Sequence, residues 1–156
     1  VVSSDCSIGA FGGYISNGVC IRVFSLSDGT IIRTFLGDST DQIFERLAIS
    51  PDNKFVAGID NYHTLSVFDI TTGLLVKRLE LGTTPNYIKY SSDGKFLIME
   101  RNKKLRFYNT TNWSAEDRMF YNDDSYCMGI DNNDQFVAVG FFNSNAKIYI
   151  ILIIKN

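Results

Sequence analysis

The sequence predicts an all-β fold built from repeated units, and three observations support this prediction. The hexapeptide Ser50–Phe55 recurs as Ser91–Phe96 and, more loosely, as Asp131–Phe136, so the closing phenylalanines stand 41 and 40 residues apart. Such a fixed period is typical of repeat architectures. Short segments rich in β-branched and aromatic residues lie between these turns, which is the composition of strands. Continuous helical periodicity is absent from the whole chain.

A second sequence marker keeps the same phase as the first. It consists of an apolar, an aromatic and then usually a small or polar residue, and its aromatic members are separated by 44, 40 and 41 residues. The four occurrences are Val23-Phe24-Ser25, Val67-Phe68-Asp69, Phe107-Tyr108-Asn109 and Ile148-Tyr149-Ile150. Two independent markers with one phase are hard to produce by chance. We therefore predict four copies, at about residues 1–43, 44–84, 85–125 and 126–156.

The second copy shows its strands most clearly. Each is about five residues long and is bounded by turn residues. The four are predicted at Arg46–Ile49, Phe55–Ile59, Leu65–Phe68 and Leu74–Leu79. Asn53, Gly73 and Gly94 stand in the tight turns of the second and third copies, where the backbone needs a positive φ.

The remaining copies are assigned by the same pattern. Ser114–Tyr121 is the best candidate for a helix, but it falls where the fourth strand of the third copy belongs, so we predict a strand there. The first copy is predicted to begin at or just before its second strand, with only Val1-Val2 left of its first. The last copy is predicted to end on its third strand, within Ile148–Ile154. We therefore expect a portion of a larger structure, or a chain that needs a partner to cover its open ends.

These features resemble the WD40 repeat, which forms one blade of a β-propeller. The resemblance rests on the turn Ser50–Phe55, on the phrase Leu65–Gly73 and on Thr34–Asp38, which stands where the family usually has Leu-x-Gly-His. It implies about four blades, each a four-stranded antiparallel sheet, that form a segment of a seven- or eight-bladed propeller. A second propeller family, of the YVTN type, is similar through Leu81–Asn86 and implies the same architecture.

The chain also departs from the WD40 pattern. The Trp-Asp pair is replaced in every copy, and no Gly-His pair is present. The replacements are Phe24-Ser25, Phe68-Asp69, Tyr108-Asn109 and Tyr149-Ile150. The His–Asp–Ser–Trp hydrogen-bond network seen in many members of that family is therefore not expected here. We expect each of these aromatic side chains to fill the space between neighbouring blades.

Charge and composition exclude several classes of protein. Lys+Arg number 15 and Asp+Glu 17, for a net charge of −2, whereas nucleic-acid-binding domains normally need a basic face. Three scattered cysteines are too few for a disulfide scaffold. The only histidine, His63, leaves little room for histidine-based catalysis. The sequence shows no signal peptide and no apolar run that could span a bilayer, so we expect a cytoplasmic protein without membrane insertion.

Two further motifs have a structural interpretation that we favour over a functional one. Gly9–Gly13 could suggest a phosphate-binding loop, but neither a lysine nor a helix start follows it, so we interpret these residues as strand glycines. Cys6, Cys20 and Cys127 lack metal-ligand spacing and are expected to be buried free thiols. Cys6 and Cys20 could also approach each other within the first copy.

Charged and aromatic residues in loops are the candidates for partner contacts. The basic cluster Arg101–Arg106 could contact an anionic partner, although a solvated loop is the simpler interpretation. The acidic residues Glu116-Asp117 and Asp123-Asp124 are interpreted as polar connections rather than as a Ca²⁺ or acid–base site. Trp113, in a tight turn, could anchor a partner. The residues that we predict to contact a partner are Tyr62, His63, Arg101, Lys103, Lys104, Trp113 and Phe142.

The function predicted from these observations is a protein–protein interaction scaffold that presents inter-strand loops. The WD40 resemblance implies this role, and the sequence offers no catalytic, cofactor-binding or metal-binding motif. One alternative is a YVTN-type propeller enzyme of redox or hydrolytic class whose active-site residues lie outside this segment. A second alternative is an architectural wall in a large assembly. Other proteins are the expected partners, and no cofactor is expected.

Overall fold

The computed structural model describes residues 1–16, 18–38, 42–120, 125–141 and 146–150, and all their regular secondary structure is β. This confirms the predicted all-β class. The chain divides into two compact units, Val1–Thr84 and Pro85–Asn156. The strands are β1 (Ile8–Ile15), β2 (Gly18–Ser25), β3 (Ile31–Leu36), β4 (Phe44–Ile49), β5 (Phe55–Asp60), β6 (Thr64–Asp69), β7 (Leu75–Glu80), β8 (Tyr87–Tyr90), β9 (Phe96–Arg101), β10 (Lys104–Asn109), β11 (Ala115–Phe120), β12 (Ser125–Ile130), β13 (Phe136–Phe141) and β14 (Ala146–Ile150).

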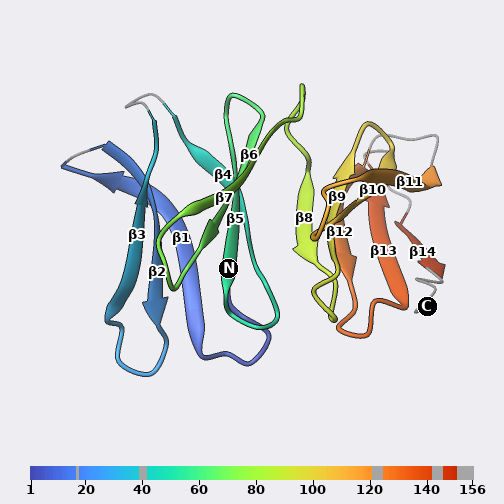
Figure 1. The fold of residues 1–156 in the computed structure, drawn as a ribbon. Helices are drawn as coiled ribbons and strands as arrows, with labels where there is room; N and C mark the ends of the chain where they lie inside the picture. The colour runs from blue at the N-terminus through green and yellow to red at the C-terminus, as the bar shows by residue number, and fades with distance from the viewer. Residues whose placement is uncertain (17, 39–41, 121–124, 142–145, 151–156) are drawn as a thin grey trace. The chain divides into compact units, whose positions relative to one another are not determined.

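The first unit contains two open antiparallel sheets, with strand orders β1-β2-β3 and β4-β5-β6-β7 (Figure 1). All four strands predicted in the second copy are present, with ends that differ by at most two residues. Strand β5 is buried along almost its whole length, whereas the outer strand β7 is mostly exposed. This difference explains why β5 has a nearly continuous apolar sequence and β7 carries charged residues.

The second unit contains the sheets β8-β9-β10-β11 and β12-β13-β14, in which neighbouring strands are again antiparallel (Figure 1). The segment that was the best helix candidate forms strand β11, as predicted. Its residues pair with β10 from Tyr108↔Ala115 to Lys104↔Phe120. A helix would leave the outer backbone groups of β10 without these partners, so the sheet decides the conformation of this segment.

The residues before β1 run along the outer side of that strand, and the N–H of Ser3 donates to the carbonyl oxygen of Ile8 (2.9 Å). Val2 forms an isolated bridge to Gly9, and two main-chain hydrogen bonds of 2.8 and 2.9 Å join Val1 to Ala10.

In the second and third sheets, one serine hydroxyl holds the turn that precedes the second strand. In the second sheet, the Ser50 hydroxyl donates to Asp52 Oδ1 (2.6 Å) and accepts the N–H of Phe55 (2.9 Å). Asn53 has a φ of 60°, which confirms the predicted positive φ. The side chain of Asn53 also donates to Asp5 (2.8 Å) and Ser7 (3.0 Å), and so connects the turns of the two sheets.

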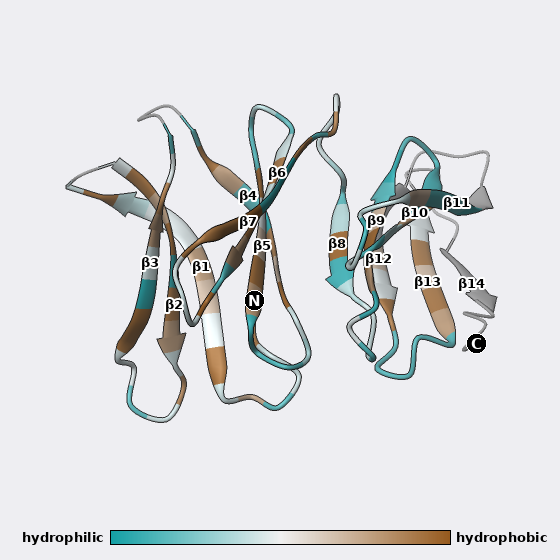
Figure 2. Ribbon diagram, in the orientation of Figure 1, coloured by the Kyte–Doolittle hydropathy of each residue, from teal (hydrophilic) through white to brown (hydrophobic). Residues whose placement is uncertain are grey.

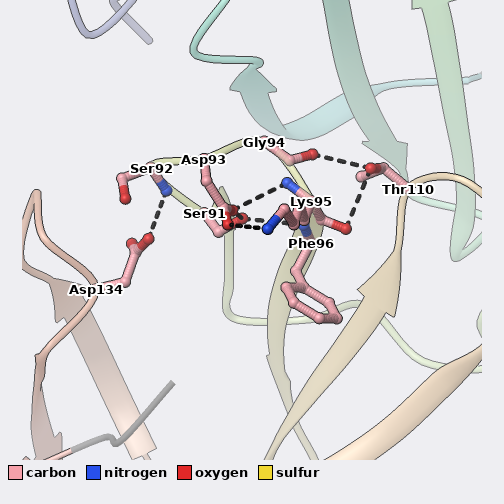
Figure 3. A network of polar contacts seen from close by, with 8 residues as sticks. All are labelled: Ser91, Ser92, Asp93, Gly94, Lys95, Phe96, Thr110 and Asp134. Carbon is pink, nitrogen blue, oxygen red and sulfur yellow. Dashed lines mark hydrogen bonds and ion pairs between the residues drawn. The ribbon is translucent and has the colours of Figure 1, made fainter. Parts of the chain in front are cut away.

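The third copy of this turn has the same geometry (Figure 3). The Ser91 hydroxyl donates to Asp93 Oδ1 (2.8 Å) and accepts the N–H of Phe96 (2.9 Å), and Gly94 has a φ of 73°. The N–H of Ser92 donates to the carboxylate of Asp134 (2.5 Å), which connects the two sheets of the second unit (Figure 3).

The fourth copy of the turn differs from this geometry, and the first copy shares it. In the fourth, the Asp131 carboxylate replaces the serine and accepts the N–H groups of Gln135 (2.7 Å) and Phe136 (2.8 Å). The first copy, Ser3–Ile8, is a turn that the repeat pattern does not predict. Its Ser3 hydroxyl donates to Asp5 (2.7 Å) and accepts the N–H of Ile8 (3.1 Å), so a Ser-x-Asp search would have found it.

The core of the first unit lies between its two sheets. Strands β2 and β5 are mostly brown in Figure 2, whereas the turns are teal, so the apolar residues gather at the centre of each sheet. The rings of Phe35 and Phe68 stack with centroids 4.7 Å apart. Phe35 belongs to the first sheet and Phe68 to the second, so the aromatic residue of the second copy fills the space between two sheets, as predicted.

Gly12 is expected to tolerate no side chain, because β1 approaches the second sheet most closely there. A Cβ on Gly12 would lie 2.8 Å from the carbonyl oxygen of Phe44, whereas a Cβ on Gly13 would meet only ring atoms of Phe11 at 3.4 Å or more. Gly12→Ala should therefore lower the free energy of unfolding by about 1–3 kcal/mol, and the matched variant Gly13→Ala should change it by less than about 1 kcal/mol. Urea denaturation followed by circular dichroism measures both; equal midpoints for the two variants would contradict this close approach.

Candidate interaction site at the hairpin end of the second sheet

Each four-stranded sheet has two ends that differ in their loops. We call the end that carries the β5–β6 and β9–β10 connections the hairpin end, and the opposite end, with the Ser50 and Ser91 turns, the serine-turn end. In the second sheet the hairpin end is organised by Asp60, the last residue of β5. Its side chain is buried and accepts three hydrogen bonds: from the N–H of Tyr62 (2.9 Å), the N–H of Thr64 (2.9 Å) and Gln42 Nε2 (2.5 Å).

Gln42 links Asp60 to the connection between the first and second sheets through two hydrogen bonds. It is buried, and its Oε1 accepts the N–H of Asp38 (2.7 Å). The Asp38 carboxylate in turn forms an ion pair with Arg78 of β7. Asp60 therefore fixes both the β5–β6 loop and, through Gln42, the position of Asp38. The sequence pattern does not predict this Gln–Asp pair.

A pocket of about 120 Å³ lies beside this network. Leu36, Phe44, Phe68 and Leu75 supply its apolar surface. Its polar lining comes from Asp38, Gln42, Ser66 and Arg78, together with Gly37. Ser66 pairs with Arg78, and Phe68 with Leu75, across β6 and β7, which places these four residues on one face of the second sheet.

Two of the predicted contact residues lie in the β5–β6 loop at this end. Tyr62 has 54% of its surface exposed. His63 is half-buried at a φ of 63°, and its Nδ1 lies 2.6 Å from the hydroxyl of Thr84. The loop therefore presents the tyrosine to solvent, whereas the histidine holds the loop to the segment after β7.

The predicted basic residues of the second unit lie at the hairpin end of the third sheet. Arg101 and Lys104 flank a two-residue turn in which Asn102 and Lys103 have φ values of 52° and 62°. Positive φ at both central residues is the geometry of a tight β-hairpin.

Much of this basic charge is neutralised within the sheet. Asp117 of β11 accepts hydrogen bonds from Lys104 Nζ (2.6 Å), Arg106 Nε (2.6 Å) and Arg106 Nη2 (3.0 Å). The hydrogen bonds from Arg106 and then Lys104 lower the pKa of Asp117 to about 2. The sequence places Asp117 more than ten residues from these cations, and only the pairing of β10 with β11 brings them together.

Acid is expected to weaken the second unit through Asp117. Because the folded-state pKa lies below the unfolded value near 4, the ion pairs stabilise the protein above about pH 4, and this contribution is lost as the pH falls through about 2. Asp117→Asn should lower the free energy of unfolding by about 1–2 kcal/mol at pH 7 and by much less at pH 2. Urea denaturation across this pH range tests the prediction; parallel stability curves for wild type and variant would refute it.

Trp113 does not belong to the same surface as the basic residues. It lies between β10 and β11, at the serine-turn end, with a φ of 60° where the corresponding turns have Gly29 (74°) and Gly73 (81°). Its side chain is half-buried. The predicted contact residues therefore occupy opposite ends of the third sheet rather than one face. Phe142 lies outside the described residues.

The other sequence motifs have structural roles or need correction. Gly9–Gly13 lie within β1, which confirms their interpretation as strand glycines. Cys20 is a buried free thiol, as predicted. Cys6 is free but exposed, so its predicted burial is wrong; it occupies the positive-φ position of the first serine turn, at 56°. The side chain of Cys127 lies outside the described residues.

Comparison with known proteins finds a relative of low sequence identity. No family model matches the sequence. The chain is 26% identical over 95 residues to the "Uncharacterized protein C4G3.03" of Schizosaccharomyces pombe (strain 972 / ATCC 24843), an alignment that covers 57% of the chain and 27% of that protein. The chain thus spans about a quarter of the relative that it matches.

The described residues contain no helix with the length and apolar character to cross a membrane. Within the same residues, no group of three or more His, Cys, Asp or Glu side chains is placed to hold a metal ion.

Proposed function

We propose that the chain is a segment of a WD40-like β-propeller that binds other proteins through loops at the hairpin end of its sheets. The repeat phase and the recurrence of one serine turn in successive antiparallel sheets support the propeller. Within each unit, two sheets also pack through apolar side chains, as neighbouring blades do.

The proposed binding role rests on one observation: a hydrogen-bonded loop exposes the side chain of Tyr62 to solvent. The loop N–H groups on either side of His63 are bonded to the buried Asp60, yet the tyrosine side chain is 54% exposed. Exposed aromatic residues dominate the binding energy of many protein interfaces. A loop that is already ordered also loses little conformational entropy when it binds.

The expected result of removing this side chain is the loss of a partner. Wild-type chain and the variant Tyr62→Ser are immobilised and incubated with extract of the source cells, and the captured proteins are quantified by mass spectrometry. At least one protein should fall about ten-fold or more with Tyr62→Ser, because hot-spot residues contribute about 2 kcal/mol or more.

Leu74→Ser is the matched control for this experiment. Leu74 is also exposed, at 66%, but lies at the serine-turn end of the same sheet. Its substitution should leave the captured set unchanged. If Tyr62→Ser captures every protein in the same amount as wild type, the proposed binding role of this loop is wrong.

We place this proposed function in the cytoplasm. Cys6 and Cys20, the two cysteines whose side chains the structure describes, are both free thiols, and a reducing compartment maintains that state. The near balance of acidic and basic residues favours protein partners over nucleic acid.

A further inference from the structure

Three contacts hold together the two sheets whose residues line the pocket near Asp60. Phe35 and Phe68 stack across the two sheets next to it. Arg33 of β3 donates to the carbonyl oxygens of Ile70 (3.0 Å) and Thr71 (2.5 Å), which fastens the same two sheets at their serine-turn end. The ion pair between Asp38 and Arg78 joins them at the pocket itself. These contacts fix the positions of the strands and of the Asp38 segment that line the pocket.

The size and walls of the pocket fit a single ring. Its volume of about 120 Å³ is well below the roughly 300–1,000 Å³ of pockets that take drug-sized ligands. Phe44 and Phe68 supply aromatic surface, and Leu36 and Leu75 supply aliphatic surface. Aromatic rings prefer to pack against one another in offset or edge-on arrangements, so an aromatic guest gains more here than an aliphatic one.

The polar groups of the pocket select for one neutral hydrogen-bonding group. Both ends of the Gln42 amide are already bonded, to Asp38 N–H and to Asp60. The charges of Asp38 and Arg78 compensate each other, so a charged ligand meets no net opposite charge. Ser66 differs: it has only 3% of its surface exposed, it lines the pocket, and its hydroxyl is the uncharged side-chain donor and acceptor that the lining offers beside the bonded Gln42 amide.

We propose that this pocket binds the phenol ring of a tyrosine side chain from a partner protein, with the hydroxyl of Ser66 bonded to the phenol oxygen. A phenol is neutral at physiological pH and combines one ring with one hydroxyl. The ring fits the apolar walls of the pocket, and the hydroxyl fits its uncharged hydrogen-bonding group. The pocket shares the network of Asp60 and Gln42 with the Tyr62 loop, so a partner at the hairpin end can reach both. In this respect the inference rests on the proposed function.

The test is a titration of the chain with N-acetyl-tyrosinamide and N-acetyl-phenylalaninamide, followed by the backbone amide resonances of Ser66, Phe68 and Arg78. The tyrosine probe should shift these resonances and bind about five-fold more tightly than the phenylalanine probe, since one hydrogen bond contributes about 1 kcal/mol. Ser66→Ala should abolish this difference, and Ser66→Thr, which keeps the hydroxyl, should preserve it. Circular dichroism of each variant verifies that the sheets remain folded.

Other results would overturn the proposal. Equal affinity of the wild type for the two probes refutes recognition of the hydroxyl, and an absence of shifts at these three amides with millimolar probe refutes the site. Tighter binding of N-acetyl-tyrosine, which carries a carboxylate, would show that Arg78 recognises an anion instead. These outcomes are distinct from failure of the proposed function, because the capture experiment depends on Tyr62 and this titration depends on Ser66.

Discussion

Replacing Asp60 with alanine is expected to lower the free energy of unfolding by about 4 kcal/mol, because the variant leaves three hydrogen-bond donors without an acceptor. Those donors are Gln42 Nε2 and the N–H groups of Tyr62 and Thr64. Each buried donor that loses its partner costs about 1–3 kcal/mol. Asp60 has only 1% of its surface exposed, so water in the folded protein replaces little of this loss.

The control for this variant is Asp69→Ala in the same sheet. Asp69 also accepts a turn N–H, from Thr72 at 2.7 Å, but it is only half-buried. Its loss should therefore cost about 1 kcal/mol. Urea denaturation followed by circular dichroism measures both variants, since the only tryptophan lies in the other unit. A similar loss for the two substitutions would contradict the central role of Asp60.

Phe107→Ala is expected to destabilise the second unit by about 3–5 kcal/mol, the usual cost of removing a fully buried phenylalanine. The ring of Phe107 is completely buried in the cluster that joins the third and fourth sheets. It contacts Phe96 edge-on, with centroids 6.0 Å apart, and the guanidinium of Arg118 lies 4.5 Å from its centre. The alanine variant loses both contacts and leaves a cavity.

Phe136→Ala provides the matched control in the same unit. Phe136 has 46% of its surface exposed, so the identical substitution should cost less than about 1 kcal/mol. The fluorescence of Trp113 and circular dichroism both report on this unit. If the two phenylalanine variants unfold at the same urea concentration, Phe107 does not hold the core of the unit.

The sequence alone predicted the strands of the second copy and the turns of the second and third copies. The second-copy strands were predicted to within two residues, and Asn53 and Gly94 have the positive φ that their turns require. These features depend on residues close together in the chain. One local feature was still missed: the first serine turn escaped detection because Ser3–Ile8 lacks the closing phenylalanine that marked the other copies.

The candidate site was only partly predictable. The position of Tyr62 and His63 in a loop between two strands followed from the turn pattern, whereas the exposure of Tyr62 is known only from the structure. Lys103 and Trp113 precede and follow one strand, β10, so their loops lie at opposite ends of the sheet. The pairing of Asp117 with Arg106 could not be predicted from the sequence, since it needs the register of β10 against β11.

The sequence by itself determined that this protein consists of short antiparallel strands in four phased copies, because turn residues and β-branched segments act over a few neighbouring positions. Only the tertiary structure determined the network of Asp60, Gln42 and Asp38, and the pocket that adjoins it. The donors and acceptors of that network come from residues 38–42 and 60–64, and Arg78 of β7 pairs with Asp38 from a third segment. Hydrogen bonds and packing between such segments form only where the folded sheets bring the segments together. A pattern of neighbouring residues in the sequence does not determine which distant segments meet.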